Sequence, residues 1–192
     1  MISLDVTDKP EILRYLGYRG GCLTENDEKK LREAVDITNK TIKVSFSWRL
    51  FDIEQTKEGI ALTDTFTVLK GESLKKHLKG YSRAVLFCIT IGKEFDIALE
   101  KAMIKDSALG VFINSCGITA VEKAADWLQK EIECELSMTT GQRFSPGYGD
   151  LPLESQRELL SLLNSEKKAG VRLNSNLLMD PVKSVSAIAG VK

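Results

Sequence analysis

The chain has 192 residues, 43% of them hydrophobic, which is enough to bury a substantial core in one large domain or in two closely packed halves. Its 27 basic and 27 acidic residues cancel, which argues against nucleic acid or an anionic membrane as partners. The longest apolar run, AVLFCITIG at 84–92, is too short to span a bilayer, and the N-terminal stretch MISLDVTDKPEILRY has charges where a signal peptide is apolar. We therefore expect a soluble, cytoplasmic protein.

The first forty residues contain two amphipathic helix patterns. Residues 8–20 are typical of a short helix with Asp8 as N-cap, and a second helix is expected from about 24 to 40. The pattern then changes to a two-residue alternation in TIKVSFSWRLF at 41–51, which predicts a half-buried strand. GIALTDTFTVL at 59–69 repeats the alternation with Phe66 among the inward positions, so the two segments predict an antiparallel pair.

The rest of the chain alternates between helical and strand patterns. Helices are expected at 73–80, 93–103, 106–136 and 153–170, and strands at 83–92 and 184–191. The strand at 83–92 is continuously apolar, which is typical of a central strand covered on both faces. We predict a single α+β domain over residues 1–192, with a mostly antiparallel sheet, flanking helices, and an N-terminal helical segment at 1–40 packed on it.

The cysteines and the histidine do not suggest a metal site or a nucleophilic site. Cys22, Cys88, Cys116 and Cys134 form no C-x-x-C pair, and none of them joins a cluster of histidines. Cys88 and Cys116 fall on apolar patterns, where a reduced cysteine behaves as a small hydrophobe. The single histidine, His77, lies among lysines and is expected at a solvated helix position, so we predict no catalytic residue of the Ser–His or Cys–His type.

The segment RFSPGYGDLPLESQ at 143–156 is too constrained for a plain connector. Two prolines and two glycines preset the backbone around Tyr148, and such a turn lets main-chain groups approach a ligand. Arg143 offers a planar fork suited to a carboxylate or phosphate. The alternative is a capping loop whose arginine pairs with a nearby acidic residue. Glu122 lies off the apolar stripe of the helix at 106–136, so its position alone predicts a solvent-facing side chain.

Five segments in order give the chain a resemblance to a known family. They are EILRYLGYRG at 11–20, AVLFCITIG at 84–92, GITAVEKAADWL at 117–128, RFSPGYGDLP at 143–152 and DPVKSVSAIAGV at 180–191. Together they resemble the activation domain of cobalamin-dependent methionine synthase, in particular its small stand-alone form. The motif R-x-x-x-G-Y followed by proline is the most specific of them. The resemblance implies an α+β fold with a bent antiparallel sheet.

The resemblance also implies a function and a set of ligand contacts. The family binds S-adenosylmethionine and rescues a corrinoid cofactor that has oxidised to cob(II)alamin, with a flavodoxin-like protein as electron donor. By position, Arg143 would hold the methionyl carboxylate, the main chain of Ser145 and Gly147 would contact the ligand, and Tyr148 would line the site. Glu122 matches a site carboxylate that suits the cationic sulfonium or amino end.

Two departures from the family pattern leave a second function open. Ser137 falls where a second acidic residue is expected, and the longer C-terminal segment with a site tyrosine has no counterpart before Lys192. These departures favour a non-catalytic S-adenosylmethionine-binding or docking subunit of a corrinoid methyltransferase system, and a structural protein without a ligand is the third alternative. The chain has no D-x-H-x-x-G corrinoid motif, so cobalamin is expected on a partner, either a corrinoid-binding protein or methionine synthase modules.

Overall fold

The computed structural model describes residues 8–18, 20 and 23–192, so the expectation for Cys22 lies outside the described residues. The helices are α1 (Lys9–Tyr15), α2 (Glu25–Thr41), α3 (Glu72–His77), α4 (Lys93–Lys105), α5 (Ser107–Leu136), α6 (Ser155–Leu162) and α7 (Ser165–Ala169). The strands are β1 (Ser45–Gln55), β2 (Ile60–Leu62), β3 (Val68–Leu69), β4 (Arg83–Thr90), β5 (Arg172–Leu173), β6 (Met179–Asp180) and β7 (Ser184–Val191). Over the described ranges, none of the helices combines the length and apolar character needed to cross a bilayer.

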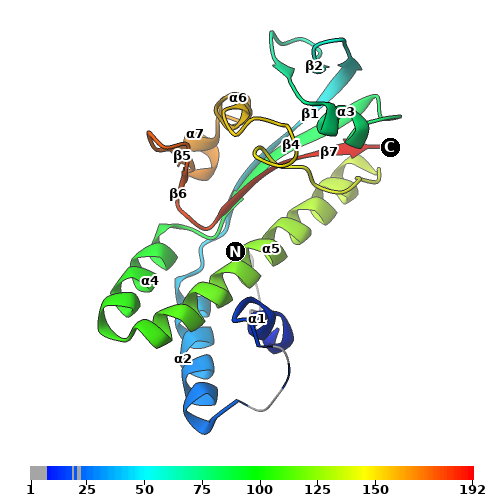
Figure 1. The fold of residues 1–192 in the computed structure, drawn as a ribbon. Coiled ribbons are helices and arrows are strands. Elements are labelled where there is room, and N and C mark those ends of the chain that lie inside the picture. The colour runs from blue at the N-terminus through cyan, green and yellow to red at the C-terminus, as the bar shows by residue number, and fades with distance from the viewer. Residues whose placement is uncertain (1–7, 19, 21–22) are drawn as a thin grey trace.

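Five strands form a bent antiparallel sheet in the order β3-β2-β1-β4-β7 (Figure 1). Phe87 of β4 lies opposite Trp48 of β1 on one side and opposite Ala187 of β7 on the other. The strands β5 and β6 make a separate two-stranded hairpin. The predicted α+β class with an antiparallel sheet is confirmed, and so are the predicted pairing of β1 with β2 and the central position of β4.

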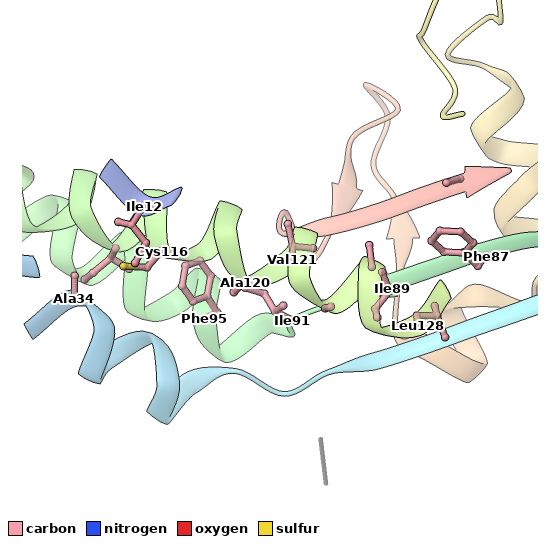
Figure 2. Close-up of a cluster of buried hydrophobic side chains, with 14 of the residues drawn as sticks. Ile12, Ala34, Phe87, Ile89, Ile91, Phe95, Cys116, Ala120, Val121 and Leu128 are labelled. Atoms are coloured by element: carbon pink, nitrogen blue, oxygen red, sulfur yellow. The ribbon is translucent and has the colours of Figure 1, made fainter. Parts of the chain in front are cut away.

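Two apolar cores cover the two faces of the sheet. One begins between the sheet and α5 and continues between α5 and the helices α1, α2 and α4; Figure 2 shows Phe87 and Ile89 of β4 in the part near Leu128 of α5. The other lies under α3, α6 and α7 and takes the alternate side chains of β4, among them Leu86. Because both faces of β4 are packed, its side chains from Ala84 onward are buried.

Helix α5 is the longest element, and three neighbouring helices pack along it (Figure 1). It begins where the side chain of Asp106 accepts a hydrogen bond from the backbone N–H of Leu109 (3.1 Å), which makes Asp106 the N-cap. Phe95 of α4 lies directly over Gly117, where an added Cβ would meet the ring at 2.2 Å. Gly117 therefore sets how closely the two helices approach.

Several local predictions are corrected by the structure. The segment 59–69 forms two short strands joined by a turn, and Phe66 in that turn is fully exposed instead of buried. Ser47 belongs to the polar set of the alternation at 41–51, which a half-buried strand would expose, but it is buried because the second core covers its side of β1. Its hydroxyl donates to the carbonyl of Leu163 (2.7 Å). The helix expected at 153–170 is broken at Asn164, whose backbone is left-handed with φ of 51°. The β5–β6 hairpin was not predicted.

Candidate functional site

The segment 139–144 runs along the outer edge of β7. Gly141 donates its backbone N–H to the carbonyl of Gly190 (2.8 Å), and Phe144 and Ile188 exchange two backbone hydrogen bonds of 2.8 Å each. A further bridge joins Thr140 to Val191. The backbone on both sides of Arg143 is therefore fixed to the sheet before its side chain makes any contact.

The C-terminal half of α5 binds the same segment from the helix side. Glu133 accepts hydrogen bonds from the hydroxyl (2.7 Å) and the backbone N–H (2.8 Å) of Thr140, and these bonds hold the pKa of Glu133 below its usual value. Gln129 donates to the hydroxyl of Thr140 and to the carbonyl of Gly141 (2.7 Å). Residues spaced three or four apart lie on one helix face, so α5 presents a continuous polar row to the segment.

Arg143 completes this row with two ion pairs. One terminal nitrogen, Nη2, donates to Oε2 of Glu122 at 3.0 Å, and the other, Nη1, donates to Oδ1 of Asp126 at 2.5 Å. The Arg143 side chain is only 23% exposed, whereas Glu122 is 44% and Asp126 62% exposed. The structure therefore brings the predicted residues Arg143 and Glu122 into direct contact, and Glu122 does not simply face solvent.

Asp126 is the site residue that sequence reasoning missed. Its signal was present, because it follows Glu122 by four residues and therefore lies one turn further along the same face of α5. Together with Arg143 it lines a polar depression of about 520 Å³, whose other walls are Gln129 and residues 140–142. The side chain of Glu122 is outside the lining of that depression.

The turn after Arg143 has the preset backbone that its composition predicts. Gly147 has φ of +88° and donates its N–H to the carbonyl of Leu151 (3.0 Å). Tyr148 donates its backbone N–H to the carbonyl of Ser145 (3.2 Å), and its side chain is 67% exposed. The Tyr148 ring lies 6.5 Å from that of Phe144, so it stands beside the segment that carries Arg143 without joining the ion-pair cluster.

Both ends of helix α3 make contacts that fix the turn and the segment before it. Asp150 accepts hydrogen bonds from the backbone N–H groups of Ser73 (2.9 Å) and Glu72 (2.8 Å), which lower the pKa of its carboxyl. At the other end, Nε2 of His77 is 2.7 Å from the carbonyl of Gln142, and its ring lies 5.0 Å from that of Phe144. The prediction of a solvated helix position for His77 is wrong, because this histidine is half-buried against the candidate site.

Comparisons with known proteins agree with this architecture. The family model described as the vitamin B12 dependent methionine synthase activation domain matches residues 135–191, a range that includes the turn and β7. No curated protein gives a significant match. Among solved structures, the crystal structure of the MetH reactivation domain bound to AdoHcy aligns with a TM-score of 0.72 at 15% identity, over 97% of this chain and 74% of that one. The resemblance seen in the sequence is thus confirmed: the chain has the fold of the MetH reactivation domain, and its C-terminal part matches the activation-domain family.

Proposed function

We propose that the chain binds S-adenosylmethionine at Arg143 and the adjoining turn, and supports reductive methylation of cob(II)alamin carried by a separate corrinoid protein. The observation that carries this proposal is the placement of Arg143. It begins a rigid turn inside the range matched by the family model, and it lies beside two carboxylates of α5. The proposal makes the chain an accessory component of a cobalamin-dependent methionine synthase or a related methyltransferase, and we place it in the cytoplasm.

The charges of the cluster suit this ligand. Arg143, Glu122 and Asp126 together have one net negative charge, whereas the methionyl part of S-adenosylmethionine has one net positive charge, from its ammonium, sulfonium and carboxylate groups. A guanidinium has five N–H donors, so Arg143 can bind a ligand carboxylate while it keeps an ion pair to helix α5. Glu122 bonds Arg143 through Oε2, which leaves its other oxygen, Oε1, to face the ammonium or the sulfonium.

The turn offers main-chain groups next to this cluster. Within residues 23–192, the N–H of Ser145 and the carbonyl of Gly147 have no intramolecular hydrogen-bond partner. Both are therefore available to a ligand, as the resemblance implies for these positions. The exposed ring of Tyr148 supplies an apolar surface that would cover one side of the bound molecule.

The chemistry required of the protein is positioning. S-adenosylmethionine supplies an electrophilic methyl group on a cationic sulfonium, and the corrinoid partner supplies the nucleophile, so no Ser, Cys or His of this chain has to attack. The residues of the chain hold the methyl donor in a fixed orientation, which lowers the entropic cost of reaching a reactive geometry. A flavodoxin-like protein is proposed as the electron donor.

A second function is favoured by one observation. Arg143 is already neutralised by Glu122 and Asp126, as expected of an arginine with a structural role. The alternative is a non-catalytic subunit that binds S-adenosylmethionine or docks on a corrinoid methyltransferase without presenting the methyl group.

Two measurements separate these functions. Calorimetric titration of the purified chain with S-adenosylmethionine tests binding. In the second measurement, cob(II)alamin on its corrinoid protein is mixed with a one-electron donor and S-adenosylmethionine, and methylcobalamin formation is followed with and without the chain. Acceleration that is lost in Arg143→Ala supports reactivation. Binding without acceleration supports the non-catalytic alternative, and no binding at all contradicts every function that requires S-adenosylmethionine.

A further inference from the structure

The two carboxylates that hold Arg143 differ in where they lie. Glu122 is the less exposed of the two and stays outside the polar depression, whereas Asp126 is 62% exposed and lines the depression together with Arg143. The Asp126 contact is also the shorter, at 2.5 Å, and it uses Nη1, the terminal nitrogen that Glu122 leaves free. Asp126 thus occupies the part of the guanidinium that lies at an open, polar surface.

We propose that Asp126 is an internal competitor of the ligand: it occupies Arg143 as a carboxylate until the carboxylate of a bound ligand displaces it. This inference rests on the proposed function and adds a regulatory residue to the same site. Asp126 and the ligand carboxylate carry the same charge and seek the same N–H donors. Both cannot be accommodated closely at one guanidinium edge without repulsion.

Displacement of Asp126, and not of Glu122, follows from solvation and support. The more exposed carboxylate regains water at the lower free-energy cost when its ion pair breaks. Glu122 meanwhile keeps its 3.0 Å bond to Nη2, and the backbone bonds between Phe144 and Ile188 keep the segment on the sheet. Arg143 can therefore exchange one partner without losing its orientation.

The exchange has a consequence for ligand selection. A ligand with a carboxylate must compete with Asp126, so its affinity is reduced by the strength of the Asp126 ion pair. A ligand that lacks the carboxylate leaves Asp126 in place and gains from its negative charge if the ligand is cationic. Asp126 therefore weakens the binding of carboxylate ligands and does not weaken the binding of cationic analogues without this group.

The test combines one substitution, at Asp126, with the removal of one group, the carboxylate, from the ligand. Wild type and Asp126→Asn are titrated with S-adenosylmethionine and with decarboxylated S-adenosylmethionine, which keeps the ammonium and sulfonium but lacks the carboxylate. The substitution is expected to tighten binding of S-adenosylmethionine about three- to tenfold, from the free energy of an exposed ion pair and the removed repulsion. Binding of the decarboxylated compound is expected to be unchanged or weaker, so that only the ligand with the carboxylate gains affinity from the substitution.

Matched controls separate this effect from general changes in charge or folding. Glu131→Gln removes one negative charge at an exposed position of the same helix and is expected to leave both affinities within about twofold of wild type, since solvent and salt screen an exposed charge that makes no contact with the ligand. Thermal unfolding of both variants checks that the fold is kept, and Asp126→Ala provides a second substitution without a side-chain amide.

The outcomes are distinguishable from those of the proposed function. If wild type binds S-adenosylmethionine but Asp126→Asn binds it equally or more weakly, the competitor role is wrong and Asp126 positions Arg143. If Asp126→Asn increases the affinity for both ligands equally, the effect does not involve the ligand carboxylate, and the inference is also overturned. If no variant binds either compound, the proposed function fails, and with it any role for Asp126 as a competitor.

Discussion

Asp150 caps helix α3 through the backbone N–H of Ser73, a residue 77 positions earlier in the chain. Gly71 occupies the N-cap position of that helix and has no side chain with which to accept a hydrogen bond. An added Cβ at Gly71 would lie 3.0 Å from Oδ1 of Asp150, so the absence of a side chain there leaves room for the carboxylate. The turn that follows Arg143 is thus fixed by a helix from another part of the sequence.

Asp150→Asn should lower the unfolding midpoint at neutral pH, because an amide accepts hydrogen bonds from the two N–H groups less strongly than a carboxylate. The pKa of Asp150 is lower in the folded protein than its ordinary value of 3.8. Its contribution to stability is therefore complete above about pH 5 and decreases as the pH falls below the unfolded value toward the folded one. Denaturant unfolding at several pH values from 7 to 3 measures the difference between wild type and variant.

That difference should shrink as the pH decreases. The matched control is Asp36→Asn, which makes the same exchange at an exposed position of α2. A difference for Asp150→Asn that stays constant over the whole pH range would contradict the assigned role of the carboxylate.

Arg143→Lys should weaken binding of S-adenosylmethionine although the charge is kept, because an ammonium cannot reproduce a planar fork that donates to several acceptors at once. We expect a loss of about 1.5–3 kcal/mol, the range for charge-assisted hydrogen bonds. Calorimetry measures the loss, and Arg157→Lys makes the same exchange at an exposed position of α6. Equal affinities for wild type and Arg143→Lys would assign Arg143 to a purely structural role.

Gly147→Ala should weaken ligand binding more than its effect on folding predicts. At φ of +88°, an L-residue is strained by about 1–2 kcal/mol. Gly80→Ala is the matched control, because Gly80 has φ of +82° and an added Cβ there would meet no atom within 4 Å. Both variants should lose comparable stability in thermal unfolding, but only Gly147→Ala should lose affinity for S-adenosylmethionine. Normal binding by Gly147→Ala would mean that the turn is an ordinary connector.

Gly117→Ala should destabilise the protein although alanine favours a helix. The added methyl group would overlap the buried ring of Phe95, and overpacking of this kind costs about 1–3 kcal/mol, more than the gain of about 1 kcal/mol in helix propensity. Denaturant unfolding measures the change. Adding Phe95→Leu should restore part of the lost stability, because the smaller side chain leaves space for the methyl group. Independent, additive effects of the two substitutions would be inconsistent with this contact.

Two cysteines should be inert in the folded protein. Burial raises the pKa of Cys88 to about 12 and that of Cys116 to about 11, so almost none of either thiol is present as reactive thiolate at pH 8. Cys134 is exposed and should react readily with a thiol reagent. In a Cys22→Ser variant, one thiol is expected to be labelled rapidly in the native state, and the other two only after unfolding. Rapid native labelling of Cys88 or Cys116 would contradict their burial.

The sequence patterns predicted the elements whose hydrophobic period is long and regular. The strands β4 and β7 and the helix α5 follow from local composition alone, because a buried strand or a one-sided helix needs a specific residue type at nearly every position. The prediction that Phe66 faces inward was wrong, because the apolar and polar residues alternate there by chance in a turn between β2 and β3. The break at Asn164 depends on a single left-handed residue, which no periodic pattern records.

The site was only partly predictable because its contacts are between distant residues. The preset turn and Arg143 were visible from proline, glycine and arginine spacing. The partners of Arg143 on α5 and the contact of His77 with Gln142 depend on how α3, α5 and the turn pack together. A charged residue on a helix face gives the same pattern whether it faces water or an arginine, so the four-residue spacing of Asp126 from Glu122 indicates a shared helix face but does not by itself indicate a contact with Arg143.

The segment 139–144 also has a protective consequence. Strand β7 ends the five-stranded sheet, and an open edge strand offers unpaired N–H and C=O groups to any other extended chain. The backbone bonds from Gly141 and Phe144 to β7 occupy such groups. Without the segment, the backbone groups along this edge of β7 would be open to pairing with another extended chain. Because the same segment presents Arg143, any variant that detaches it should expose the sheet to edge-to-edge aggregation as well as lose the binding site.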